Sequence, residues 1–408
     1  MVTTVVVGGL LTAAGLWYVP RWLGTGLPEL GIGVSVRLVD TPIGVECVGY
    51  SDRSGQTFGD SDWMRTAQRA VFEMNETAAR LHAESPARPL VSVIYLSELT
   101  KPEGQVGADD STVEQLTGLL LLQAWANQPS DHPTPVLRVV IANAGFLMSQ
   151  AGTAVDLITP LLEQDRSVLG VVGMSRTVDS VEQAITRLGD LGVPVVGTTL
   201  TGTGLTNRSP LYFQVIPDNH QEAALVQRYA AEAGKALTVY QPESVDGDGY
   251  LASLHDELAQ LVRAEDLRLW RDVALVDPVC GADRIAFFAG RQPDFDRFLD
   301  QVLDVCGKDL PTVIGDDTVA RFVAQQAKRA NPKYSGKSIT YVSLGPLTVL
   351  RNRDCLSDGT TRATPLCAGL RDLTGGRPLA LLRLPDVRDF ARPPECVLIV
   401  NADATQCR

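Results

Sequence analysis

Short apolar runs alternate with amphipathic stretches along most of the chain. Small polar loops follow the runs, each of which is four to seven residues long. The runs occupy residues 91–96, 136–142, 168–173, 193–197, 236–240, 284–290 and 312–315. β-rich runs that alternate with helical patterns are typical of βαβ units and parallel sheets. The pattern therefore predicts an α/β protein with helices on both faces of its sheets.

Helical periodicity fills the intervals between these runs. We expect helices near residues 62–82, 112–126, 150–163, 178–191, 219–233, 250–262 and 319–329. Further strands are expected at 44–50, 212–215, 273–276 and 338–342. Residues 23–38 are rich in Gly and Leu, which is typical of a linker or irregular segment.

A chain of 408 residues is too long for one small core, so two lobes are expected. The fold class predicted is two doubly wound parallel-sheet lobes joined by hinge strands, with an N-terminal membrane segment. The expected divisions are 1–22 as an anchor, 23–86 as a linker and lead-in β-α module, 87–216 as the first lobe, 217–340 as the second lobe, and 341–408 as a return crossing and cysteine-containing tail. The hinge candidates are 212–217 and 338–342.

The N-terminal segment favours a membrane anchor. Residues 2–20 carry no charge, and a stretch of this length is about enough to cross a bilayer core of roughly 30 Å. Trp17, Tyr18 and Trp22 suit the membrane interface. A basic segment before it and a clear cleavage site after it are both lacking. A single-pass anchor at the cell membrane is predicted, with a buried N-terminal element or a signal peptide as alternatives.

The seven cysteines suggest an extracytoplasmic location for the domain. Cys280 precedes the run at 284–290 and Cys306 ends the following helical stretch, so both lie at one end of a β-α unit and could form a disulfide. The simplest further pairs are Cys355 with Cys367 and Cys396 with Cys407, leaving Cys47. Free thiols throughout are the alternative. Disulfides after an anchor favour an oxidising compartment.

Composition and motifs exclude several classes of function. The net charge is −12, and an acidic surface repels phosphate backbones, so no nucleic-acid partner is expected. Paired-cysteine zinc motifs, a nucleophile elbow, a phosphate-binding P-loop and a complete dinucleotide fingerprint are absent from the sequence. We therefore expect no enzyme activity, no catalytic residue, no metal and no cofactor.

The loops after the apolar runs suit ligand binding. Ligands of open α/β sheets lie beyond the carboxyl ends of the strands. Hydroxyl side chains follow two consecutive runs there, at Ser175, Thr177, Thr199 and Thr201. With backbone N–H groups they would hold a small carboxylate. Asp317 follows a later run and could accept from an ammonium group. Each alone is more often a helix cap or turn residue.

Four stretches carry a resemblance to a known family. They are VLGVVGMSRTVDSVEQAITRLGDLGVPVVGTTLTGTGLT (168–206), YFQVIPDNHQEAALVQRYA (212–230), ADRIAFFAGRQPDFDRFL (282–299) and TVIGDD (312–317). Because these stretches occur in the order found in that family, residues 90–345 resemble the type I periplasmic binding protein fold, especially its leucine/isoleucine/valine-binding branch. The organisation is also similar to membrane-anchored ABC transporter substrate-binding-like proteins of actinobacteria.

The resemblance implies further ligand-binding residues. It places the family's carboxylate-binding loop on 175–177, its threonine loop on 199–201, and its ammonium-binding acid on Asp317. It also implies ligand contacts at Gly290, Arg291 and Asp246. Arg291 and Asp246 stand where relatives often carry aromatics, which suits a more polar ligand. The closing helix and strands of relatives are not recognisable after residue 351.

These observations predict an extracytoplasmic solute-binding protein or sensor that closes on a small polar ligand, such as an amino acid or a related compound. An ABC permease or a membrane signalling protein would be its partner. The alternative is a non-catalytic interaction or scaffold domain of the same fold that has lost small-ligand binding. The altered pocket positions and the unusual tail favour that alternative.

Overall fold

The computed structural model describes residues 33–102, 108–129, 134–271, 274–275, 279–344, 379–391 and 394–400. These residues divide into two compact units, each of which is described by itself. Residues up to 175, with 180–196 and 208–212, form the first unit. Residues 176–179, 197–207 and those from 213 onward form the second unit. The chain therefore passes between the units several times, and two short loops of the expected first lobe belong to the second unit.

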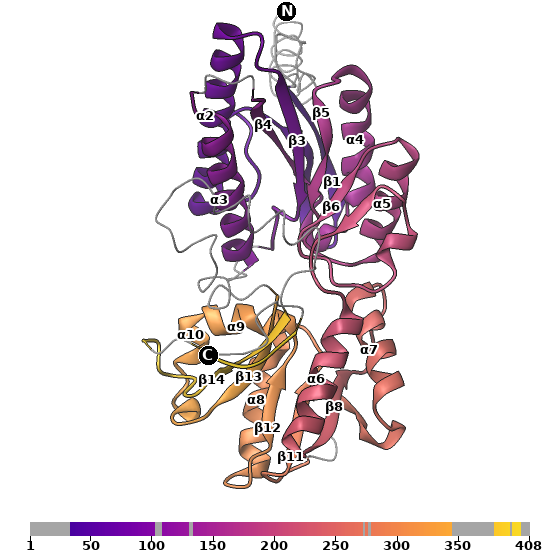
Figure 1. The fold of residues 1–408 in the computed structure, drawn as a ribbon, viewed down its shortest axis with the longest axis vertical. Coiled ribbons are helices and arrows are strands. Elements are labelled where there is room, and N and C mark those ends of the chain that lie inside the picture. Colours follow the sequence, from indigo (N-terminus) through magenta and orange to yellow (C-terminus); the bar gives the residue numbers. More distant parts are fainter. Residues whose placement is uncertain are drawn as a thin grey trace, which may run out of the picture. The chain divides into compact units, whose positions relative to one another are not determined.

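The first unit is built on a seven-stranded sheet (Figure 1). In spatial order its strands are β1 (Val34–Thr41), β2 (Gly44–Ser51), β4 (Val136–Asn143), β3 (Leu90–Ser97), β5 (Val168–Gly173), β6 (Val195–Gly197) and β7 (Tyr212–Gln214). β3 pairs in parallel with both β4 and β5, whereas β1 and β2 are antiparallel additions. Every residue of β4 is buried, including the polar Arg138 and Asn143, because helices cover both faces of the sheet.

Helices cover both faces of this sheet. In Figure 1, α2 (Asp62–Glu84) and α3 (Ala108–Ala126) lie on one side, and α4 (Ala151–Gln164) and α5 (Asp179–Asp190) lie on the other. The Ser61 side chain begins α2 by accepting a hydrogen bond from the Met64 N–H at 3.2 Å. This doubly wound arrangement places the loops after β3, β4 and β5 together at one edge.

The second unit is built on an eight-stranded sheet. In spatial order its strands are β10 (Ala274–Leu275), β9 (Leu267–Arg271), β8 (Ala236–Pro242), β11 (Arg284–Phe288), β12 (Thr312–Gly315), β13 (Ile339–Leu344), β14 (Leu379–Leu384) and β15 (Glu395–Val400). The five strands from β9 to β13 are parallel, and the others are antiparallel at the two edges.

Alternate residues of the central strands enter two different cores. Ile285 and Phe287 of β11 pack in a cluster with α6 (Asn219–Ala233) and α7 (Gly249–Leu261). Ala286 and Phe288 pack in a cluster with α8 (Gln292–Cys306). Successive side chains of a strand point to opposite faces, so the four consecutive apolar residues of β11 supply both cores. The remaining helices are α9 (Ala320–Ala324) and α10 (Gln326–Arg329).

The alternating sequence pattern predicts most of this architecture correctly. Each of the seven apolar runs contains or coincides with a strand, and two α/β units are present. The prediction of a return crossing and hinge at 338–342 is wrong, because β13 is an interior strand paired with β12 and β14. The expected linker at 23–38 overlaps β1, and the lead-in module joins the first sheet through β2. β14 and β15 supply closing strands that were not recognised in the sequence.

The expected membrane anchor at residues 1–22 lies outside the described residues. Within the described ranges, no helix combines the length and apolar character needed to cross a membrane. Of the expected cysteine pairs, Cys355–Cys367 and Cys396–Cys407 also involve residues outside those ranges.

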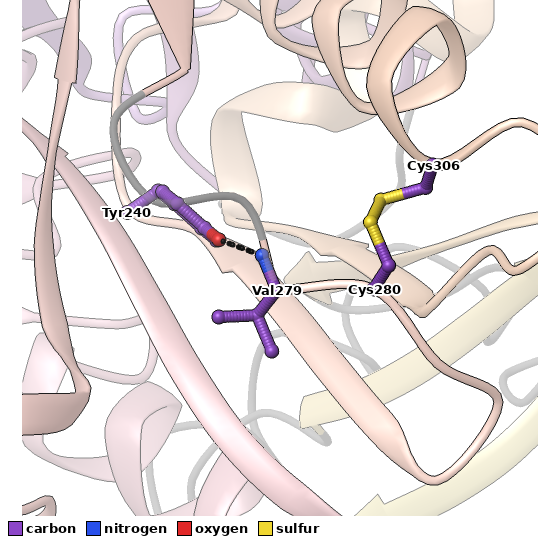
Figure 2. The surroundings of a disulfide bond; sticks show 4 residues. All are labelled: Tyr240, Val279, Cys280 and Cys306. Atoms are coloured by element: carbon purple, nitrogen blue, oxygen red, sulfur yellow. Dashed lines mark hydrogen bonds between the residues drawn. A yellow bond between two sulfur atoms is a disulfide. The ribbon is translucent and has the colours of Figure 1, made fainter.

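The expected disulfide between Cys280 and Cys306 is present (Figure 2). It joins the loop before β11 to the last residue of α8. The Tyr240 hydroxyl, at the end of the neighbouring strand β8, accepts a hydrogen bond from the Val279 N–H at 3.0 Å. Cys47 is a free, half-buried thiol. The bond closes a loop whose ends are 26 positions apart in sequence, so it restricts the unfolded chain.

Replacing both half-cystines, C280A/C306A, should lower the free energy of unfolding by about 3 kcal/mol. Without the cross-link the unfolded chain gains conformational entropy, which favours the unfolded state. Urea denaturation measures the change. A thiol reductant should lower the stability of the wild type by more than that of the double variant. Equal stability of oxidised wild type and double variant would contradict the prediction.

Candidate functional site

A fully buried aspartate marks the carboxyl end of β12. Asp316 follows the last residue of that strand and has no exposed surface. One carboxyl oxygen accepts hydrogen bonds from the Tyr250 hydroxyl at 2.8 Å and the Gly290 N–H at 3.1 Å. The other accepts from the Thr318 N–H at 3.1 Å and from its hydroxyl at 2.7 Å. Four donors satisfy this carboxyl group, so it has no obvious capacity for a ligand.

Two further carboxyl groups adjoin Asp316. Glu222, in the first turn of α6, is 1% exposed, and its Oε1 accepts the Asp317 N–H at 3.2 Å. Its Oε2 atom and the Oδ1 atom of Asp317 are buried without a hydrogen-bond partner among the described residues. We call Glu222, Asp316 and Asp317 the carboxyl cluster. Buried acceptors left unsatisfied are costly, so these two oxygens mark a place for a donor.

Burial and mutual repulsion hold protons on the cluster. Burial first, and then the charge of Asp317, raise the pKa of Asp316 to about 8. Burial and the charges of both aspartates raise the pKa of Glu222 well above its ordinary value. Burial also raises the pKa of Asp317, although hydrogen bonding to Tyr250 and the positive charge of Arg291 act in the opposite direction. At neutral pH the cluster therefore binds protons that isolated carboxylates would release.

A paired arginine covers the tyrosine of the site. The Arg291 guanidinium donates to both carboxyl oxygens of Asp248, at 2.8 and 2.5 Å. It also lies over the Tyr250 ring, with Cζ 4.3 Å from the centroid. Asp248 caps α7 by accepting the Leu251 N–H at 3.1 Å. Asp248 thus neutralises the charge of Arg291, and the guanidinium also stacks on the ring of Tyr250, whose hydroxyl donates to Asp316.

Two threonine loops join this site. The Thr177 carbonyl accepts the Tyr250 N–H at 3.2 Å, and its hydroxyl accepts the Gly202 N–H at 3.3 Å. The Thr201 carbonyl accepts from the backbone N–H of Asn219 at 2.7 Å. The Thr201 side chain also hydrogen-bonds Asp317 and favours its ionised form. Both loops belong to the second unit, so Thr177, Thr201 and Asp317 come together as one constellation.

The remaining predicted ligand residues lie in varied positions. Gly290 donates its N–H to Asp316 and is therefore part of the site. Thr199 is half-buried, two residues before Thr201. Asp246 is exposed, and its carboxylate accepts from the Ser244 hydroxyl at 2.9 Å, so nothing joins it to the carboxyl cluster.

Ser175 belongs to the first unit. Its hydroxyl accepts the Glu98 N–H at 3.4 Å, so it is held near the end of β3. The preceding residue, Met174, has a φ of 58°, a conformation that non-glycine residues seldom adopt. Backbone strain of this kind is often found at binding sites. Met174 directly follows β5, in the loop where the sequence predicts ligand binding.

The sequence did not single out Glu222 or Tyr250 as site residues. A signal for Glu222 exists, because Leu225 and Val226 lie three and four positions later on the same buried helical face. A charged residue on a buried helical face needs a specific partner, and this marks Glu222 as a candidate site residue. Tyr250 gives no comparable signal, since a tyrosine beside apolar residues of a helix is an ordinary core residue. Among the described residues, no group of three or more His, Cys, Asp and Glu side chains is arranged to hold a metal ion.

No protein-family model matches the sequence, and the comparison with curated proteins found no match. Among solved structures, an ABC transporter substrate-binding protein from Desulfitobacterium hafniense matches with a TM-score of 0.47 and 15% identity, covering 75% of this chain and 78% of that one. A complex of such a protein from Desulfitobacterium hafniense with Leu has a TM-score of 0.45 at 15% identity, with coverages of 65% and 72%.

A solute-binding protein of an ABC transporter from Rhodopseudomonas palustris BisB5, in complex with 3,4-dihydroxybenzoic acid, has a TM-score of 0.40 and 13% identity. The match covers 62% of this chain and 68% of that one. In each of these matches at most 15% of the aligned residues are identical.

The raised carboxyl pKa values predict a pH-dependent stability. A carboxyl group whose pKa is higher in the folded state stabilises the fold while protonated, and this contribution is lost as pH rises. With an ordinary aspartate pKa of about 3.9 and a folded value for Asp316 of about 8, the loss spans this interval. The free energy of unfolding should therefore fall between about pH 4 and about pH 8.

E222Q should reduce that fall, because it removes one ionisable carboxyl group and one source of repulsion. Glu232 provides a matched control, since it is an exposed residue of the same helix paired with Arg228. Urea denaturation at the two pH values measures each slope. If E222Q and E232Q keep the same pH dependence as the wild type, the cluster does not titrate as described.

Proposed function

We propose that this chain is an extracytoplasmic solute-binding protein or sensor, and that its carboxyl cluster holds the ammonium group of an amino acid or a related small polar solute. The observation that carries the proposal is a pair of buried oxygens, Oε2 of Glu222 and Oδ1 of Asp317, that have no hydrogen-bond partner among the described residues. An ammonium group carries three N–H donors and a compact positive charge. It could therefore donate a hydrogen bond to each of these two oxygens.

The division of roles within the cluster supports this ligand class. Asp316 has four protein donors and fixes the positions of Tyr250 and Gly290, so it organises the site. Glu222 and Asp317 retain the free acceptors. A bound ammonium group would replace the charge that protons supply at neutral pH. Ligand binding therefore releases protons and strengthens as pH rises through the range in which the cluster titrates.

The wider biological role rests on other observations. The Cys280–Cys306 disulfide supports an oxidising compartment. The resemblance over residues 90–345 supports delivery of the solute to an ABC permease or its presentation to a membrane signalling protein, and the uncharged residues 2–20 support a membrane anchor.

A thermal-shift panel tests the ligand class, using L-leucine, L-glutamine, putrescine and glucose with the full chain under oxidising conditions. An ammonium-bearing ligand at about a hundred times its dissociation constant should stabilise the protein by about 2.7 kcal/mol. Glucose, which has no ammonium group, should give no shift. A flat panel from folded protein, or a response to glucose alone, would refute the ammonium site.

D317N should weaken binding of the responding ligand by roughly tenfold to a hundredfold, because a hydrogen bond to a charged group contributes about 1.5–3 kcal/mol. D246N is the matched control in the same unit, since Asp246 is exposed and bonded to Ser244. Calorimetry in two buffers of different ionisation enthalpy should also show proton release by the wild type. Equal affinities of D317N and D246N would exclude Asp317 from the site.

A further inference from the structure

A pocket lies at the end of the second unit's sheet opposite to the carboxyl cluster. It has a volume of about 370 Å³, within the usual range for small-molecule sites. Thr312, the first residue of β12, lines it, as do Lys235 just before β8 and Ser338 just before β13. The carboxyl cluster follows the other end of β12, so the two sites are separated by the length of that strand.

The polar lining of this pocket is cationic. Lys235, Lys337 and Arg383 line it, and none of its lining residues is acidic. Arg383 is paired with Glu395 at 2.7 Å, so its charge is largely balanced. The Lys235 ammonium donates to the Thr312 hydroxyl at 2.7 Å, which is a neutral partner. Within the described ranges Lys337 has no acidic partner. Two positive charges are therefore left without compensation at one small cavity.

Hydroxyl groups and an apolar wall complete the pocket. Thr312, Ser338 and Thr340 contribute hydroxyls that can donate to an anion. Apolar side chains also line the pocket, namely Leu299, Leu303, Leu310 and Val313. An inorganic ion would gain nothing from contact with these apolar side chains. The combination fits a ligand with a charged head and an apolar body.

We propose that this pocket binds a small phosphate monoester, with the phosphate held by Lys235, Lys337 and the hydroxyls, and the organic group against the leucines. A phosphate monoester carries close to two negative charges at neutral pH, which matches the two uncompensated ammonium groups. Lysine binds phosphate as a point charge and needs no planar, bidentate geometry. This site is independent of the ammonium site proposed above.

Calorimetric titration of the full chain tests the proposal with phenyl phosphate as the probe. Phenyl phosphate should bind saturably, and phenyl sulfate, of nearly the same shape with a single charge, should bind at least about tenfold more weakly. Phenol and inorganic phosphate should each bind more weakly than phenyl phosphate, since each lacks one half of the ligand. No binding of phenyl phosphate at millimolar concentration, or equal affinity for phenyl sulfate, overturns the proposal.

Variants identify the pocket as the place of binding. K337A and K235A should each weaken phenyl phosphate binding about tenfold, since each removes one charge-assisted contact. K333A is the matched control, because Lys333 is paired with Asp304 at 2.9 Å and does not line the pocket. Equal loss in K333A and K337A would show only a general charge effect and would refute the site. D317N should leave phenyl phosphate binding unchanged, which separates this test from that of the ammonium site.

Discussion

The burial of Asp316 at the end of β12 is the constraint on which the second unit's binding edge depends. A carboxyl group without exposed surface must be surrounded by donors, and the donors come from three separate parts of the chain. Tyr250 brings the start of α7, Gly290 brings the loop after β11, and Thr318 closes the following turn. Arg291 and Thr177 then bind Tyr250, so one buried group determines the positions of several loops.

The sequence predicts the interior of the fold better than its margins. Buried parallel strands are largely apolar in sequence, so β4 and β11 were recognisable even though they contain Arg138 and Arg284. β1 is a half-exposed edge strand beside a glycine-rich segment, and β14 follows a polar, cysteine-containing region, so both were missed. In the site, Asp317 was predicted from its place after a strand. Glu222 was not predicted as a site residue, because it is 95 positions away from Asp317 in sequence and only the fold brings the two together.

The two ends of β12 have opposite electrostatic characters. Beyond its carboxyl end lie three acidic side chains that share protons, and at its amino end lie lysines with neutral or no partners among the described residues. Parallel strands make such a division simple, because all of their carboxyl ends lie at one edge of the sheet and all of their amino ends at the other. A single sheet can thus carry sites for ligands of opposite charge without mutual interference.

The Cys280–Cys306 disulfide makes the stability of the second unit depend on where the chain is. The bond joins the loop before β11 to the end of α8, close in sequence to Ala282 and Leu303, which line the pocket at the amino end of β12. In a reducing compartment the same polypeptide lacks this cross-link and unfolds more readily, which exposes it to proteases. The same polypeptide is therefore longer-lived in oxidising than in reducing surroundings, so its lifetime reports the redox state of its environment.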